Sequence, residues 1–482
     1  MPGKDEEVPN ENLKYIVTTV QDSESILEEA SGDINIKTKE KMMSPNQGHK
    51  RNFSQRAFGK LEKGSIRGSI FALSASAIGS GVLSLPYVLG LNGWVLGLVF
   101  ILVGAFSAGW SLYMIAESAI KAKVENLSKL SYLVGGKKLE KFLQINIMVF
   151  LCGSCISYQI IVSALLARFL MKCGVNREEK YAFFDTWHYR AMQAIPTAVI
   201  IIFPLSMIKD MSGFRHISIV SIFALVYTGI VLICELPEYI NAYKNKTDVD
   251  IEYACFDWNL FTGASITFFA YTCHAQLLPI YSELVNPNER RIKKVVARSI
   301  STDVLFYVII ALAGYFATYN KTPKIVLDRS IPDDDTPDPF MMVAQLGIVL
   351  VLFVALPANY NPFRNQLFYI FFGRDSFSQK ENIICTGIFT SFTCFIAIVY
   401  PNVSSVLGIL GGLNATSIQF LVPMICSINV SGQPVKAPSN IIKILFFGFL
   451  CLVGYANVGT TIYRIFSGND VIGRGPDNLC KA

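Results

Sequence analysis

Apolar residues in this chain gather in blocks of about 20 positions, separated by short connectors, and a block of that length spans a bilayer as a helix. Lipid cannot hydrogen-bond exposed backbone groups, so a helix is the form that such blocks take. The pattern predicts an all-α membrane protein with eleven transmembrane helices, at residues 68–90, 93–117, 142–171, 191–208, 216–236, 259–283, 300–319, 340–363, 383–400, 403–428 and 441–464.

The composition agrees with a protein that resides in the lipid bilayer. Of the 482 residues, 52% are hydrophobic and only 16% are charged, a balance that soluble domains of this size do not have. Residues 1–66 begin acidic and contain no apolar core, which predicts a disordered cytosolic tail. Residues 67–466 would then form the transmembrane domain, and 467–482 a short non-cytosolic tail.

Basic residues indicate how the helices are oriented. Lys and Arg cluster before the first block, after the second and after the sixth, whereas the loop after the seventh block is rich in Asp. The positive-inside rule therefore places the N-terminus in the cytosol. The net charge of +6 is read as this topology signal, and it does not indicate nucleic acid as a partner.

Several polar positions are candidates for modification or metal binding. The sequons at Asn245 and Asn320 both fall in predicted outer loops, where glycosylation occurs. Cys173 and Cys255 lie near outer helix ends, so a disulfide between them is a hypothesis. The C-x-x-C pattern that ends at Cys155 lies inside an apolar block without a second ligand pair, so we expect helix packing there and neither a metal nor a cofactor.

The first block is interrupted near its middle by Gly79, Gly81 and Pro86. Gly lowers the barrier to unwinding, and Pro lacks the N–H that a continuous helix needs, so the helix is predicted to break there. Free backbone groups at this depth are tolerated only around a cavity. The amides around Gly81 and Val82 would open a half-helix whose positive end suits a carboxylate.

The sixth block is interrupted in a similar way, by the run Tyr271-Thr272-Cys273-His274 and by Pro279. The first and sixth helices hold equivalent positions if helices one to five and six to ten form inverted repeats. In that arrangement the substrate lies at the interface between the two repeats.

Four motifs carry a resemblance to a known family. They are Gly79-Ser-Gly-Val-Leu-Ser-Leu-Pro86, Cys273-His-Ala-Gln-Leu-Leu-Pro-Ile-Tyr-Ser-Glu-Leu284, Pro357-Ala-Asn-Tyr-Asn-Pro-Phe-Arg364 and Leu407-Gly-Ile-Leu-Gly-Gly412. Together they resemble the amino acid/auxin permease family, above all the neutral amino acid transporters of systems A and N, over about residues 66 to 465. The resemblance implies a leucine-transporter-type fold, with two inverted repeats of five helices and one added helix.

The resemblance also implies where a substrate would bind. By motif match, the backbone N–H groups of the first break would hold its carboxylate, and carbonyl oxygens of the sixth would accept its ammonium group. The implied residues are Gly79, Ser80, Gly81 and Val82 for the carboxylate, and Tyr271, Thr272 and Cys273 for the ammonium group. Both ends of a zwitterion would then meet opposite partial charges.

The coupling ion is implied by a departure from the family pattern. Sodium-coupled members use an Asn in the first helix and a Thr in the eighth, where this chain has Ala75 and Ala355. Neither side chain can supply an oxygen ligand, so a proton gradient or exchange is favoured over sodium. A shift of one position would bring Ser74 or Ser76 into range.

Three ionisable residues are candidates for proton transfer or for gating. His274 lies inside a spanning helix and is a candidate proton carrier, although it could equally hydrogen-bond a neighbouring helix. Glu283 and Arg364 flank the predicted cytosolic ends of helices six and eight. They could form a gating ion pair, or serve as solvated anchors.

The sequence thus predicts a secondary active transporter of neutral amino acids that works by alternating access. The alternative is an amino-acid-sensing receptor that signals through the cytosolic tail. An enzyme is not expected, because the apolar blocks contain no paired carboxylates, nucleophile elbow, phosphate loop or metal cluster. The plasma membrane and a vacuolar or lysosomal membrane both stay open as locations.

Overall fold

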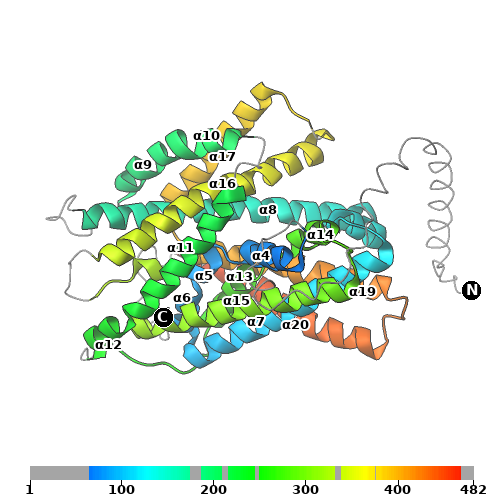
Figure 1. Ribbon diagram of the computed structural model, residues 1–482, viewed down its shortest axis with the longest axis horizontal. Helices are drawn as coiled ribbons and strands as arrows, with labels where there is room; N and C mark the ends of the chain where they lie inside the picture. Colours follow the sequence, from blue (N-terminus) through cyan, green and yellow to red (C-terminus); the bar gives the residue numbers. More distant parts are fainter. Residues whose placement is uncertain are drawn as a thin grey trace, which may run out of the picture. The chain divides into compact units, whose positions relative to one another are not determined.

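The computed structural model describes residues 64–173, 186–208, 215–244, 249–331, 338–374 and 376–467. All regular elements in these ranges are helices (Figure 1). Each of the predicted apolar blocks coincides with one helix or with a series of short helices. The uninterrupted helices are α7 (Trp94–Ala122), α11 (Arg215–Cys234), α15 (Glu289–Thr318), α16 (Pro339–Phe372), α17 (Gln379–Val399) and α20 (Pro438–Ser467). α8 (Leu127–Lys172) is one long element with a kink at Gly136.

The remaining segments are divided. The first consists of α4 (Ile66–Ala77), α5 (Ser80–Leu83) and α6 (Leu85–Asn92), and the sixth of α13 (Asn259–Ala270) and α14 (His274–Ser282). The fourth and tenth contain π-helical turns: α9 (Trp187–Pro196), η1 (Thr197–Ile202) and α10 (Phe203–Met207), then α18 (Val403–Ile409), η5 (Leu410–Ala415), η6 (Ser417–Leu421) and α19 (Val422–Val430). A short helix, α12 (Leu236–Lys244), follows α11.

By length and composition, eight spans in the described part of the chain could cross a membrane, or nine if the bent pair α11 and α12 is one span. The first and sixth segments do not pass as single helices because each is broken near its middle. An all-helical membrane protein is therefore confirmed, and the number eleven stays a prediction.

Two helices begin well before the predicted boundary. α15 begins at Glu289, where the side chain of Asn288 accepts a hydrogen bond from the Arg291 amide at 2.9 Å. The basic run from Arg290 to Arg298 thus forms the first turns of the seventh span. α8 begins at Leu127 and departs from helical geometry at Gly136, whose φ of 64° suits glycine. Hydrophobicity alone missed both starts because these first turns are polar.

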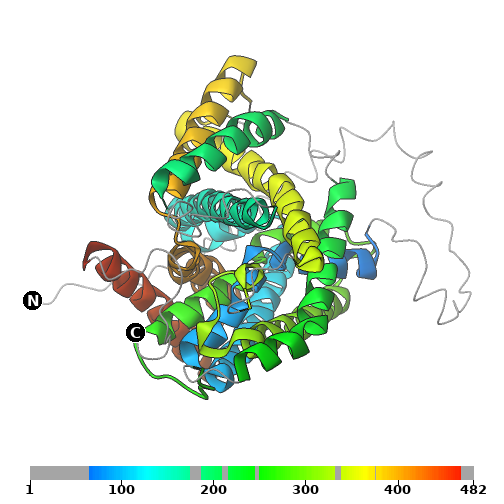
Figure 2. The same ribbon diagram turned by 90° about the vertical axis from the view of Figure 1, so that its left-hand side faces the viewer.

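Helices that are far apart in the sequence pack in pairs. α7 packs against α15, α8 against α16, α10 against α17, and α13 against both α5 and α6. Figure 2 looks along α8 and shows α16 and α17, in yellow to orange, gathered beside it. The sixth segment, through α13, therefore lies directly on the first segment, through α5 and α6.

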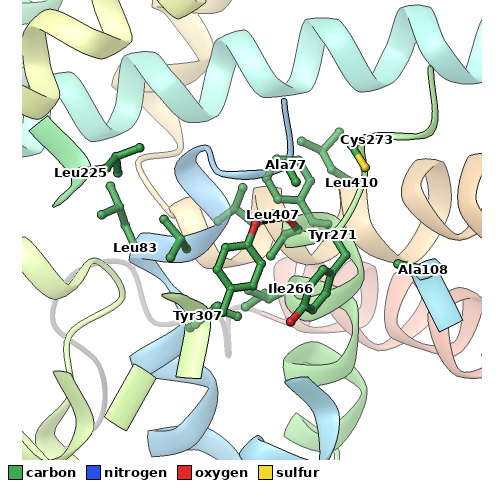
Figure 3. Packing of buried hydrophobic residues seen from close by; sticks show 14 of the residues in the cluster. Ala77, Leu83, Ala108, Leu225, Ile266, Tyr271, Cys273, Tyr307, Leu407 and Leu410 are labelled. Atoms are coloured by element: carbon green, nitrogen blue, oxygen red, sulfur yellow. Dashed lines mark hydrogen bonds between the residues drawn. The ribbon is translucent and has the colours of Figure 1, made fainter. Parts of the chain in front are cut away.

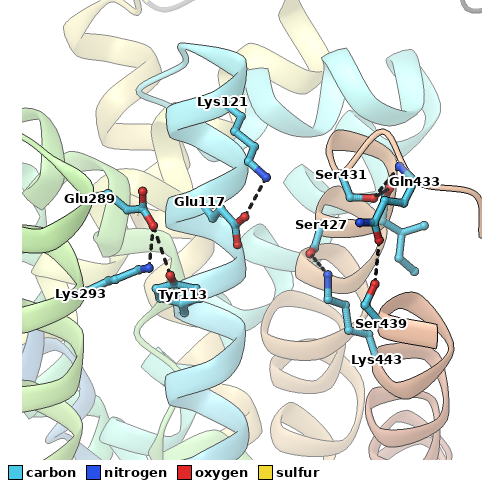
Figure 4. Close-up of polar contacts among 11 residues, drawn as sticks. Tyr113, Glu117, Lys121, Glu289, Lys293, Ser427, Ser431, Gln433, Ser439 and Lys443 are labelled. Carbon is cyan, nitrogen blue, oxygen red and sulfur yellow. Dashed lines mark hydrogen bonds and ion pairs between the residues drawn. The ribbon is translucent and has the colours of Figure 1, made fainter. Parts of the chain in front are cut away.

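Polar contacts join the ends of several helices (Figure 4). Glu289 of α15 accepts a hydrogen bond from Tyr113 of α7 at 3.3 Å and pairs with Lys293 at 2.6 Å. The Lys293 ammonium also lies 4.3 Å from the centre of the Tyr113 ring. These contacts tie the end of α7 to the start of α15, so the predicted cytosolic connectors after the second and sixth segments lie on one side.

Two predictions about the outer loops are corrected. Cys173 is an exposed free thiol, whereas Cys255 is disulfide-bonded, so the pairing of these two residues is wrong. The partner of Cys255 lies outside the described residues, since the other described cysteines are free. Asn320 is only 2% exposed, and a buried amide has no room for a glycan, which argues against glycosylation there.

Other predictions fall on parts of the chain that the structure does not describe. The sequon asparagine Asn245 lies outside the described residues, and so do nearly all of the predicted tails, residues 1–66 and 467–482. The disordered and cytosolic character of the N-terminal tail remains a prediction.

Cysteine labelling tests the corrected pairing. We expect Cys255→Ser to gain one thiol that reacts with a maleimide-polyethylene glycol in denatured, unreduced protein, because the bonded partner is released. Cys173→Ser is the matched control and should lose one label, because its thiol is already free. Gel mobility counts the labels, and a gain of one label in Cys173→Ser would contradict the assignment.

Candidate functional site

Two breaks in the helices define the candidate site. α4 ends at Ala77, Ile78 is extended with a ψ of 93°, and α5 begins after Gly79. α13 ends at Ala270, and the next helix begins only at His274. The first amides and last carbonyls of a helix lack partners within that helix, so both breaks expose backbone polar groups. The sequence-predicted breaks are thus present at the predicted residues.

The two breaks touch each other. A Cβ added to Gly81 would lie 2.8 Å from the Cα of Ala270, closer than side-chain carbons normally come to a backbone. Gly81 is therefore required for α5 to approach the end of α13. The positive end of one short helix and the negative end of another consequently lie side by side.

The backbone groups of the second break are partly used. The Tyr307 hydroxyl donates to the Ala270 carbonyl at 2.7 Å, and the Cys273 amide donates to the Tyr271 carbonyl at 3.0 Å. Within the described ranges, no hydrogen bond uses the carbonyl of Thr272. Among the three predicted carbonyl acceptors, that of Thr272 is thus the most available. Figure 3 shows Tyr271 and Tyr307 side by side here, with ring centres 4.9 Å apart.

The tenth segment contributes a residue that the sequence reasoning missed. Gln419, fully buried in the π-helical turn η6, accepts a hydrogen bond from the Thr272 hydroxyl at 3.2 Å. Its amide nitrogen has no partner among the described residues, and the same holds for the buried hydroxyls of Ser80 and Ser84 near the first break. Buried polar groups normally have partners, so these atoms are available to hydrogen-bond water or a ligand at the two breaks. The π-turns at Leu410–Leu421 could not be read from the sequence.

Tyr158 of α8 faces the first break. A Cβ on Gly79 would lie 3.7 Å from the Tyr158 hydroxyl, which also accepts a hydrogen bond from Asn359 at 3.4 Å. Asn361, two residues further along α16, instead donates to the Ile208 carbonyl at 3.1 Å. The structure thus brings Tyr158 to the site together with Asn359, and leaves Asn361 elsewhere.

His274 is held by a neutral partner. Its Nε2 lies 2.7 Å from the hydroxyl of Ser111 on α7, and its Nδ1 has no hydrogen bond in the described part of the chain. A neutral imidazole satisfies this contact fully at Nε2. The interhelical hydrogen bond considered as an alternative is therefore present, and a proton-carrying role for His274 remains a prediction.

Arg364 is buried in a neutral cage rather than paired with Glu283. It is 1% exposed, donates to Asn382 at 2.6 Å and to the Ser206 carbonyl at 3.3 Å, and lies over Phe377. Asn382 also donates to the Met207 carbonyl at 3.3 Å. These side chains cap the C-terminus of α10, where a positive charge is favourable.

Glu283 follows α14 and is exposed. The gating ion pair between Glu283 and Arg364 is not formed in this structure, so it remains a prediction.

Ion pairs at the predicted outer side join three separate parts of the chain. Arg329 donates to Glu235 at 2.6 Å and lies 4.2 Å from the centre of the Tyr239 ring, while Arg168 of α8 pairs with Asp328. Leu327, next to Asp328, is fully buried. The loop after the seventh segment is thus fixed both to α8 and to the junction of α11 and α12.

Comparisons with known proteins agree with a transport site. The sequence model of the family described as "Transmembrane amino acid transporter protein" matches residues 62–466. "Putative amino acid transporter AAT1" of Toxoplasma gondii is 25% identical over 314 residues, which are 65% of this chain and 41% of that protein. The match therefore spans less than half the length of this relative.

Two solved structures are similar at a low level. The crystal structure of MhsT in complex with L-phenylalanine has a TM-score of 0.48 and 15% identity, covering 80% of this chain and 98% of the other. The Eremococcus coleocola manganese transporter, in complex with an aromatic bis-isothiourea substituted compound, has a TM-score of 0.48 and 10% identity, covering 84% and 88%.

The caging of Arg364 is tested by a stability comparison. Arg364→Met should lower the melting temperature of the detergent-solubilised protein, because it leaves Asn382 and the end of α10 unpaired inside the protein; such losses cost about 1–3 kcal/mol per group. Arg374→Met is the matched control, since Arg374 pairs with Glu381 at an exposed site, where an ion pair contributes about 0–1 kcal/mol. Equal losses of stability in the two variants would contradict the cage.

Proposed function

This chain belongs to the transmembrane amino acid transporter family, and we propose that it carries amino acids across a membrane by alternating access. The observation that carries the proposal is the contact between the two breaks, where Gly81 abuts Ala270. Backbone polar groups are tolerated at mid-span only where they line a cavity. A site of this kind suits a transporter, and the family is one of transporters rather than enzymes.

The substrate is a zwitterion in this proposal. The amides at Gly79, Ser80, Gly81 and Val82 belong to the positive end of a helix and would hold the carboxylate. Carbonyls from Tyr271 to Cys273 extend the negative end of α13 and would accept the ammonium group, with that of Thr272 the most available. Main-chain recognition of both groups selects α-amino acids as a class. The side chain would extend toward Tyr158, whose hydroxyl faces Gly79.

The helix pairs support a leucine-transporter-type arrangement for this chain. If segments one to five and six to ten are inverted repeats, then α7 corresponds to α15, α8 to α16, and α10 to α17. All three pairs are in direct contact, as are the two broken helices. Equivalent elements around a pseudo-two-fold axis meet in this way, and the substrate site of such transporters lies at that axis.

A proton gradient or exchange is favoured over sodium as the driving force. Ala75 and Ala355 supply no oxygen, and the two neighbouring serines are turned to other partners. The Ser74 hydroxyl lies 2.8 Å from that of Ser299 on α15, and Ser76 donates to the Leu73 carbonyl at 2.7 Å. Neither serine is therefore directed to the eighth segment, where a sodium site would need it.

Uptake by purified protein in liposomes tests the proposal. We expect labelled neutral amino acids to accumulate with an inward pH gradient in sodium-free buffer, or to exchange against internal amino acid. Uptake that requires a sodium gradient would contradict the coupling. Absence of both uptake and exchange, combined with binding that depends on the N-terminal tail, would favour the amino acid sensor.

The contact between the two breaks can be tested by one methyl group. Gly81→Ala should abolish uptake, because its Cβ meets the backbone of Ala270, which cannot move aside without separating α5 from α13. Gly448→Ala in α20 is the matched control, since no atom lies within 4 Å of its added Cβ. We expect the control to transport normally. Normal uptake by Gly81→Ala would remove the contact from the mechanism.

A further inference from the structure

Asp303 is a buried carboxylate in the middle of a spanning helix. It lies in α15, it is fully buried, and neither of its oxygens makes a hydrogen bond within the described ranges. The hydroxyls of Ser74 and Ser299 lie beside it, 2.8 Å from each other, and because only one of them donates in that contact, the other keeps a proton that it can donate to the carboxylate. Ser299 is four residues earlier on α15, so it shares a helix face with Asp303.

The groups that face Asp303 carry no positive charge. They are the phenol groups of Tyr271 and Tyr307 and the thiol of Cys273, together with Ser74 from α4. α6, α7, α11 and α12 also pack against α15. In the described part of the chain, none of them presents a Lys, Arg or His to this carboxylate. Among the described residues, no cationic side chain therefore neutralises Asp303.

A buried carboxylate without a cation is unstable in its ionised form. At the centre of a membrane helix, an Asp costs about 2.5–3.5 kcal/mol even by the mildest scales. The group avoids this cost by binding a cation. Sodium takes several oxygen ligands, whereas only two described side-chain hydroxyls, those of Ser74 and Ser299, flank Asp303. A proton needs only one carboxylate oxygen.

We propose that Asp303 is the group that takes up and releases the coupled proton during transport. This inference rests on the proposed transport function, and it replaces His274 as the proton carrier. A proton from water on one side forms an O–H bond at a carboxylate oxygen and gives a neutral carboxylic acid. That bond breaks on the other side, where water accepts the proton and the carboxylate is regenerated.

The neighbours of Asp303 connect it to the substrate site. Tyr307, one turn further along α15, donates to the Ala270 carbonyl at the second break. Ser74 lies on α4, which ends at the first break. A change of charge at Asp303 therefore acts on both broken helices, through the hydroxyl pair on one side and through Tyr307 on the other. Protonation removes the charge of Asp303, so that the side chain can stay buried where α4 packs against α15.

Two measurements distinguish this proposal from the proposed function: accumulation of amino acid under a pH gradient, which tests proton coupling, and exchange at equal pH, which tests transport itself. With one proton per substrate, a gradient of one pH unit drives about a tenfold accumulation, since each tenfold corresponds to about 1.4 kcal/mol. We expect Asp303→Asn to reduce the accumulation ratio to about one, while exchange of labelled for unlabelled amino acid at equal pH persists. Failure of the proposed function would appear differently, as a wild-type protein without accumulation or exchange.

Controls make each outcome decisive. Asp303→Ser, a smaller neutral side chain, is measured in parallel, and persistent exchange in either variant shows that the protein is folded and binds substrate. Accumulation of amino acid by Asp303→Asn under a pH gradient would overturn the proposal. So would a result in which His274→Asn loses accumulation but keeps exchange, while Asp303→Asn keeps both. Loss of exchange in both Asp303 variants would also overturn it, because the proposal separates coupling from binding. Wild-type accumulation that follows only a sodium gradient would assign the site to sodium.

Discussion

The backbone of a membrane helix must find its hydrogen bonds within the protein, and the rest of this structure depends on two places where it does not. At Gly79 and at Tyr271 the helical ladder stops inside a span. Each break alone would leave polar groups facing lipid. Side by side they face each other, and this proximity requires a residue without a side chain at Gly81. Around this contact, α7 packs on α15 and α8 packs on α16, so that helices surround the two breaks.

The sequence predicted those features that depend on local chemistry. Gly79, Gly81 and the polar run after Ala270 interrupt apolar blocks, so both breaks could be located to the residue. Helix starts made of polar residues were missed, namely those of α15 at Glu289 and of α8 at Leu127. An apolar block shows only the part of a helix that can lie in lipid, whereas the start of the helix is set by the residues that cap it.

Features that depend on distant contacts could not be read from one sequence. The cage of Arg364 combines a side chain of α17 with a carbonyl of α10. Gln419, in the π-helical turn η6, accepts a hydrogen bond from Thr272, which is 147 residues earlier in the chain. Asp303 is a different case, since an ionisable residue inside an apolar block is a visible signal. The same reasoning that selected His274 applies to Asp303. Only the structure distinguishes the two residues. His274 has a hydrogen-bond partner in Ser111, whereas no described cation lies beside the buried Asp303.

Two of the buried charges in the described part of the chain, Arg364 and Asp303, have opposite surroundings. Arg364 is coordinated on the scaffold side, where Asn382, the end of α10 and an aromatic ring hold it. A charge satisfied in this way fixes α10, α16 and α17 together, because any displacement would leave it unpaired in a poorly polar interior. Asp303 lies where α15 meets α4 and has no such coordination. If Asp303 carries the coupled proton as proposed, its protonation changes the electrostatic energy of the interface between α4 and α15 during the transport cycle.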